Sequence, residues 1–239
     1  MEHRDRLWPG GYTFLYDDGL FRPSTDTFLL GAFPRLRRGM AVCELGAGTG
    51  LLSLLLLARE PELTVTGVEL QPQACALFRR TAEENGLQGR MHCLEGDLRQ
   101  GLLPPGRFRL AVANPPYFPP DAGAVAPDAA RRTARAETDC TLAQLCAAAA
   151  RALTWGGSFC LVFRAERMPE LFACLKGCGM EPKRLRLVQN TAQAAPKLLL
   201  LEAKKGGRPG LAVLPPLLLR DPDGGESAEL SRIYFRDKE

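Results

Sequence analysis

A short run, Asn-Pro-Pro-Tyr, combines hydrogen-bond acceptors with a flat aromatic ring. Asn114 offers a side-chain carbonyl and Pro115 a main-chain carbonyl, and both can accept hydrogen bonds from one amino group. Pro115 adds no competing donor, because proline lacks a backbone N–H. Pro116 stiffens the turn, and the ring of Tyr117, with Phe118 beside it, offers a surface for stacking. The run therefore predicts a site for a planar amino group.

These acceptors suit attack by a conjugated amino nitrogen on an electrophilic carbon. Such a nitrogen becomes positively charged as it attacks, so acceptors aimed at its N–H groups stabilise the transition state. The reaction needs no metal ion and no covalent nucleophile. The eight cysteines form no Cys-x-x-Cys pair and only two histidines accompany them, so we expect no metal site. Asn114, Pro115 and Tyr117 are the expected catalytic residues.

A second run, Glu-Leu-Gly-Ala-Gly-Thr-Gly, begins at Glu44 after an apolar stretch. Its glycines, Gly46, Gly48 and Gly50, allow a tight turn and let a ligand approach the start of the next helix. A dinucleotide-binding turn would need a third glycine where this chain has Leu51. The spacing Gly-x-Gly-x-Gly instead resembles the first motif of the S-adenosylmethionine-dependent methyltransferases.

Two acidic residues end the next two expected strands. Glu69 stands where nucleotide-binding α/β folds place an acid that accepts hydrogen bonds from ribose hydroxyls. Asp97 stands where the methyltransferase pattern places an acid beside the adenine amino group. We therefore expect S-adenosylmethionine as the cofactor. The expected cofactor site comprises Glu44, Gly46, Gly48, Gly50, Glu69, Leu70, Asp97, Leu98 and Asn114.

These motifs lie where apolar strands alternate with helical segments. We expect strands at 40–45, 63–70, 90–95, 108–113 and 158–163, and helices at 51–59, 72–85, 142–153 and 169–178. The alternation predicts a Rossmann-like, doubly wound α/β fold with a mostly parallel sheet, as in the class I methyltransferases. Two further runs, 184–188 and 198–203, have no helix between them, so we expect an antiparallel edge strand.

The composition is that of a globular protein, with 46% hydrophobic and 24% charged residues. The apolar runs are too short to cross a bilayer and residues 1–11 lack the apolar stretch of a leader, so we expect a cytoplasmic protein without a membrane partner. We expect one methyltransferase domain over residues 1–239. In it, 1–39 would cover substrate and cofactor, 40–205 form the core and 206–239 a tail.

A segment rich in Ala, Pro and Arg, without periodic apolar residues, spans 118–138. Loops of that length are usually functional or disordered. The net charge of +4 permits a polyanionic partner, and the arginines of this segment are suited to bind phosphates. The expected substrate-binding residues are Pro116, Tyr117, Phe118, Arg131, Arg132 and Arg135.

Segments that flank both motifs resemble the bacterial tRNA(Val) adenine-N6-methyltransferase family. The resemblance covers nearly the whole chain and is carried by Asp-Thr-Phe-Leu-Leu at 26–30, Ala-Arg-Ala-Glu at 134–137, Leu-Glu-Ala-Lys-Lys-Gly at 201–206 and the tail at 223–234. It implies methylation of the adenine N6 amino group in a tRNA anticodon loop, with RNA as the partner. It also implies that Asp26 closes over the methionine part of the cofactor.

Other substrates stay open. Arg-Pro-Ser-Thr-Asp at 22–26 also resembles a segment of the glutamine-N5-methyltransferases of release factors, which share Asn-Pro-Pro-Tyr because a glutamine amide is another planar amino group. Those enzymes carry a helical substrate domain ahead of the fold, and the 43 residues before Glu44 show no series of amphipathic helices. An adenine of rRNA or DNA is a second alternative. A third alternative is an RNA-binding protein without catalytic activity. The complete Asn-Pro-Pro-Tyr run disfavours it.

Overall fold

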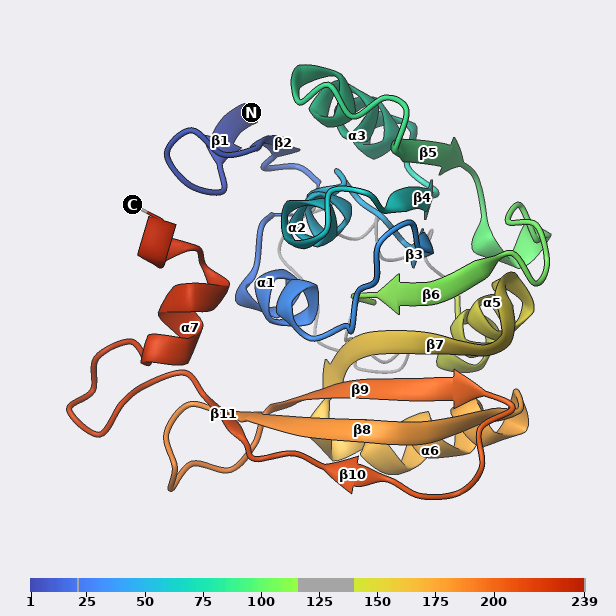
Figure 1. Ribbon diagram of the computed structural model, residues 1–239, viewed down its shortest axis with the longest axis vertical. Helices are drawn as coiled ribbons and strands as arrows, with labels where there is room; N and C mark the ends of the chain where they lie inside the picture. The colour runs from blue at the N-terminus through green and yellow to red at the C-terminus, as the bar shows by residue number, and fades with distance from the viewer. Residues whose placement is uncertain (21, 116–139, 239) are drawn as a thin grey trace.

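A twisted nine-stranded sheet crosses the structure, a computed structural model that describes residues 1–20, 22–115 and 140–238 (Figure 1). The strand order is β10-β8-β9-β7-β6-β3-β4-β5, with β11 also paired to β8. The strands are β3 (Ala41–Leu45), β4 (Thr64–Glu69), β5 (Met91–Glu95), β6 (Phe108–Ala113), β7 (Leu153–Arg164), β8 (Met180–Gln189), β9 (Leu198–Lys205), β10 (Ala212–Val213) and β11 (Leu217–Leu218).

The five strands from β5 to β7 pair in parallel, as expected for βαβ units. Strand β9 is antiparallel to both of its neighbours, β7 and β8. The expected antiparallel pair is therefore present, but two short strands, β10 and β11, pair in parallel along the outer side of β8. Strand β8 is longer than expected and its register with β9 shifts at Pro182, which has no N–H to donate.

Helices cover both faces of the sheet because alternate strand residues point to opposite sides. On one side Val42 packs with α1 (Thr25–Ala32), α2 (Leu51–Arg59) and α3 (Pro72–Glu84). On the other side Cys43 packs with α5 (Leu142–Ala152) and α6 (Met168–Gly177). Figure 1 shows the two groups on either side of the central strands. This arrangement confirms the expected doubly wound fold.

Both ends of the described chain add elements beyond the expected ones. A hairpin of β1 (Glu2–Arg6) and β2 (Thr13–Asp17) packs on α3, where the backbone N–H of Leu15 donates to the buried hydroxyl of Thr81. Helix α7 (Ala228–Ile233) packs on α1. The ring of Trp8 lies against that of Phe235, with centroids 4.9 Å apart. The two described ends of the chain thus meet where Trp8 contacts Phe235.

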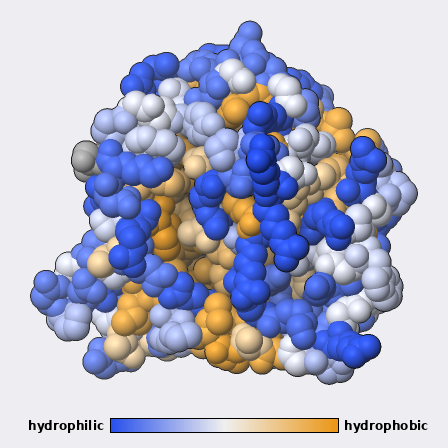
Figure 2. All heavy atoms as spheres, viewed as in Figure 1, coloured by the Kyte–Doolittle hydropathy of each residue, from blue (hydrophilic) through white to orange (hydrophobic). Residues whose placement is uncertain are grey.

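The described residues also contain short 3₁₀-helical turns, namely η1 (Leu98–Gln100), η2 (Ala165–Arg167) and η3 (Arg236–Lys238). Figure 2 shows hydrophilic side chains spread over one face of the molecule, with apolar residues exposed between them. In the described part of the chain, no helix has the length and apolar character needed to span a bilayer.

Candidate active site

The glycine-rich loop turns between β3 and α2 at the carboxyl end of the parallel strands. The backbone N–H groups of Gly46 and Ala47 both donate to the carbonyl of Val68, each at 3.0 Å, so the loop is tied to the end of β4. Gly46, Gly48 and Gly50 have φ angles of +72°, +52° and +89°, which L side chains rarely adopt. A Cβ at Gly46 would contact nothing within 4 Å, so the loop leaves room for a ligand there.

Glu69 holds this loop to the start of α3. Its carboxylate accepts hydrogen bonds from the backbone N–H of Gly48 at 2.7 Å and of Gln71 at 2.9 Å. The residue is 9% exposed, so the carboxylate lies at the bottom of the turn with only part of its surface open. The following residue, Leu70, is half-buried. An acid in this position can accept further hydrogen bonds from a ligand hydroxyl.

Glu44, by contrast, points toward α2. It is 3% exposed and accepts a hydrogen bond from the hydroxyl of Ser53. Burial raises the pKa of this carboxyl to about 8, against an ordinary value of 4.5. The role of Glu44 as a cofactor contact stays a prediction, because its described partner is a residue of the core.

This buried carboxyl makes the stability of the fold depend on pH. The folded protein holds the Glu44 proton more tightly than the unfolded chain does, so its contribution is fully present below about pH 4.5 and is lost as the pH rises toward 8. Over that window the free energy of unfolding should fall by up to about 1.4 kcal/mol per pH unit.

We expect Glu44→Gln to flatten this decline, because the amide carries no titrating proton. Urea unfolding of both proteins at several pH values between 5 and 8 measures the difference. Glu83→Gln serves as the control, because it makes the same chemical change at an exposed residue of α3. Equal slopes for Glu44→Gln and the parent protein would contradict the assignment.

Asp97 caps the turn that follows β5. Its carboxylate accepts a hydrogen bond from the backbone N–H of Arg99 at 2.8 Å. It also forms an ion pair with the guanidinium of Arg99 at 2.6 Å. The hydrogen bond from the Arg99 side chain lowers the pKa of Asp97. Leu98 is half-buried beside it. Asp97 therefore presents a charged acceptor at the same edge as the glycine loop.

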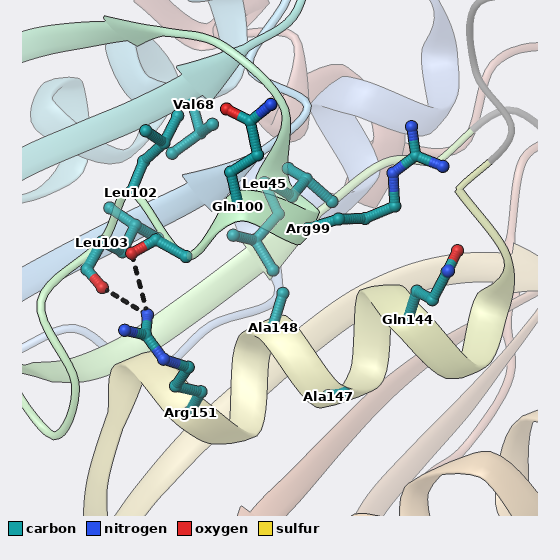
Figure 3. Close-up of a pocket in the computed structure, with 12 residues that line it drawn as sticks. Leu45, Val68, Arg99, Gln100, Leu102, Leu103, Gln144, Ala147, Ala148 and Arg151 are labelled. Carbon is teal, nitrogen blue, oxygen red and sulfur yellow. Dashed lines mark hydrogen bonds between the residues drawn. The ribbon is translucent and has the colours of Figure 1, made fainter.

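A cavity of about 410 Å³ lies next to this turn, on the α5 side of the sheet. Figure 3 shows Ala148 of α5 pointing toward Leu45 of β3, below the chain that follows β5. The guanidinium of Arg151 closes one end by donating to the carbonyls of Gly101 and Leu103, at 3.0 and 2.8 Å. Of the expected cofactor residues, only Leu98 lines this cavity.

Asn114 ends β6, in the middle of the carboxyl edge. Its side-chain Nδ2 donates to the hydroxyl of Thr27 on α1 at 3.0 Å. Thr27 is 3% exposed, and Ser24 places its hydroxyl 3.2 Å from that of Thr27. This contact joins residues 87 positions apart and brings the helix that carries Asp26 to the end of β6. Sequence reasoning missed Thr27, because nothing in its local pattern marks it as a partner of Asn114.

The structure thus brings the ends of β3, β4, β5 and β6 together, with Pro115 half-buried after Asn114. No group of three or more potential metal-ligating side chains occurs within the described ranges. Six expected substrate-binding residues lie outside the described residues, namely Pro116, Tyr117, Phe118, Arg131, Arg132 and Arg135.

The chain is similar in sequence to known methyltransferases. Residues 22–176 match the family model of the methyltransferase small domain. The chain is 33% identical over 223 residues to the tRNA1(Val) (adenine(37)-N6)-methyltransferase of Cronobacter sakazakii, covering 89% of this chain and 88% of that protein. The protein of the same name from Tolumonas auensis is 29% identical over 228 residues, or 92% of this chain and 94% of that protein.

The fold is similar to solved methyltransferase structures. A predicted O-methyltransferase from Agrobacterium tumefaciens has a TM-score of 0.72 at 20% identity, covering 88% of this chain and 95% of that one. The geranyl diphosphate C-methyltransferase of Streptomyces coelicolor, solved with S-adenosyl-L-homocysteine, has a TM-score of 0.54 at 11% identity, covering 71% and 72%. These similarities confirm the expected class I methyltransferase fold.

Proposed function

Because this chain belongs to the methyltransferase small domain family and to the family of tRNA1(Val) (adenine(37)-N6)-methyltransferases, we propose that it methylates the N6 amino group of an adenine in tRNA. S-adenosylmethionine is the methyl donor. The observation that supports this proposal most is the position of Asn114, which stands at the end of β6 beside the glycine loop of the adjacent strand β3. The protein acts in the cytoplasm, where its tRNA substrate is found.

The carboxyl edge of the sheet would hold the cofactor. The backbone of Gly46 and Gly48 would approach it at the turn, and Glu69, which accepts from the N–H of Gly48, would also accept hydrogen bonds from its ribose hydroxyls. Asp97, with Leu70 and Leu98 nearby, would accept from the amino group of the cofactor's adenine. Asp26, in the first turn of α1, would lie over the methionine part. When bound, the cofactor supplies a methyl group made electrophilic by the sulfonium.

Asn114 and Pro115 act on the target base. The side-chain carbonyl of Asn114 and the main-chain carbonyl of Pro115 accept hydrogen bonds from the two N–H groups of the adenine amine. These acceptors stabilise the positive charge that develops on nitrogen as it forms the new N–C bond and the S–C bond breaks. The nitrogen then loses one proton to solvent. Tyr117 stacks on the base, which must first leave its neighbours in the RNA.

The decisive experiment identifies the methylated product. The protein is incubated with labelled S-adenosylmethionine and, in separate reactions, with tRNA, rRNA, DNA and release factors from a strain that lacks the gene. We expect label in tRNA only, recovered as N6-methyladenosine by mass spectrometry. Methylglutamine in a release factor, or label in rRNA or DNA alone, would overturn the proposed substrate.

Glu69→Gln should weaken S-adenosylmethionine binding about ten- to a hundredfold. The carboxylate makes charge-assisted hydrogen bonds, each worth about 1.5–3 kcal/mol, to the loop and to the ribose. Calorimetric titration measures the affinity. Glu95→Gln is the matched control, because Glu95 ends β5 directly opposite Glu69 but, among the described residues, makes only a 4.0 Å contact with Arg79. Equal affinities for the two variants would show that Glu69 does not hold the cofactor.

A further inference from the structure

The start of β7 exposes an aromatic ring at the edge of the sheet opposite to Asn114. Trp155 is 77% exposed, the largest exposure of any aromatic side chain in the described ranges. Its ring packs directly on the backbone of Gly206, because a Cβ added there would lie 2.2 Å from the ring. In Figure 1 the arrowheads of β6 and β7 lie on the left, whereas β7 begins and β9 ends on the right. The indole is thus held in place while most of its surface faces solvent.

Exposed cations gather at this same edge. Arg107 and Arg109 flank Phe108, which pairs with Leu153 at the start of β7. The backbone N–H of Arg107 donates to the carbonyl of Ala152. Lys204 precedes Lys205 at the end of β9. Four exposed cations at this edge make no ion pair with any described residue, namely Arg107, Arg109, Lys204 and Arg208.

Within the described ranges, neighbouring acids do not neutralise these cations. Glu202 pairs with Arg184 at 2.8 Å, and Glu181 pairs with Lys176. Two further cations of β8 and β9 serve the fold, because Arg186 pairs with Glu229 and Lys205 donates to the carbonyl of Leu153. The remaining charge at this edge is therefore positive and open to an outside partner.

We propose that Trp155, Arg107, Arg109, Lys204 and Arg208, here called the Trp155 patch, form a second RNA-binding surface. The proposal rests on the proposed tRNA substrate. The cations bind phosphates, and the indole stacks on an unpaired base, which is the usual combination for RNA contacts without sequence readout. Strand β6 separates the patch from Asn114 by six residues, or roughly 20 Å at about 3.3 Å per residue. A folded tRNA that places its target base at Asn114 extends far enough to reach it.

The Trp155 patch lies away from Asn114 and the cofactor site, so substitutions in the patch should affect RNA binding alone. We expect Trp155→Ala to raise the KM for tRNA about tenfold with kcat and S-adenosylmethionine affinity unchanged, and Trp155→Phe to restore most of the loss. Arg109→Ala should weaken binding and reduce the slope of log affinity against log salt by about one, whereas Trp155→Ala should leave that slope unchanged. Arg6→Ala, which removes an exposed cation on β1, is the matched control and should behave as the parent.

Fluorescence provides a second readout. The chain has two tryptophans, so Trp155 is the only one left in Trp8→Phe, and its emission should be quenched by tRNA. If the parent methylates tRNA but KM, salt slope and Trp155 emission do not respond as expected, the patch is not an RNA surface and the proposed function stands. If the parent methylates no tRNA, the proposed function itself fails.

Discussion

Replacing Asn114 with alanine is expected to lower turnover about a hundred- to a thousandfold, with S-adenosylmethionine affinity within a few-fold of the parent. The lost carbonyl acts on charge that develops only as the target nitrogen attacks, and removing one such preorganised group typically has an effect of this size. The hydrogen bond from Asn114 to Thr27 holds the side chain at the end of β6 before any substrate arrives. The loss should therefore appear in kcat rather than in cofactor binding.

Single-turnover rates on tRNA, paired with calorimetric titration of the cofactor, measure the two quantities. Asn190→Ala makes the same chemical change at an exposed residue between β8 and β9, and should leave both values unchanged. Turnover of Asn114→Ala close to that of Asn190→Ala would show that Asn114 is not catalytic.

Gly50→Ala should reduce the free energy of unfolding by about 2–5 kcal/mol. Position 50 has a φ of +89°, and a left-handed conformation costs an L residue roughly 1–2 kcal/mol. In addition, the new Cβ would lie 2.6 Å from Met91 Cε and 2.7 Å from the buried ring of Phe78, an overpacking that costs about 1–3 kcal/mol. Both effects act at the first residue before α2.

Denaturant unfolding measures the change, and Gly86→Ala separates its two causes. Gly86 has a φ of +65°, but a Cβ there would meet nothing within 4 Å. Gly86→Ala should therefore reduce the free energy of unfolding only by the cost of the left-handed backbone conformation. Equal losses at the two positions would show that Phe78 and Met91 accommodate the methyl group.

The central elements were predictable because their apolar periods are local. The segments 51–59 and 108–113 match α2 and β6 residue for residue. The other expected helices and strands, apart from β7 and β8, differ by a residue or two at their ends. Strand β7 begins earlier than expected, because Leu153 already pairs with Phe108 of β6. Residues 154–157, which resemble a turn, lie within the register shift between that pair and the pair of Ser158 with Leu110. The first part of β8 was likewise not predicted, because Pro182 lies in it and a proline inside a segment argues against a strand there.

The peripheral elements could not be predicted because distant residues hold them. The hairpin of β1 and β2 is tied to α3 by contacts such as the N–H of Thr13 with Asn85 at 2.8 Å. Strands β10 and β11 have two residues each, and they form only because they pair with β8. For the candidate site, the motifs placed Gly46, Glu69 and Asn114 at one edge of the sheet. The contact with Thr27 depends on the position of α1, which no local pattern reveals.

The contact between α1 and the tail also sets the order in which the site forms during translation. The hydroxyl of Tyr234 donates to Thr25 at 2.7 Å, between residues 209 positions apart, and the Tyr234 ring lies 4.8 Å from that of Phe28. At roughly 5–20 residues per second, the ribosome needs on the order of ten to forty seconds to synthesise that interval. Until residues 228–238 emerge, the helix that positions Asn114 lacks one of its supports and Phe28 faces the solvent or a chaperone. A nascent chain at this stage contains every residue of the glycine loop and the Asn-Pro-Pro-Tyr run, yet its site is still incomplete.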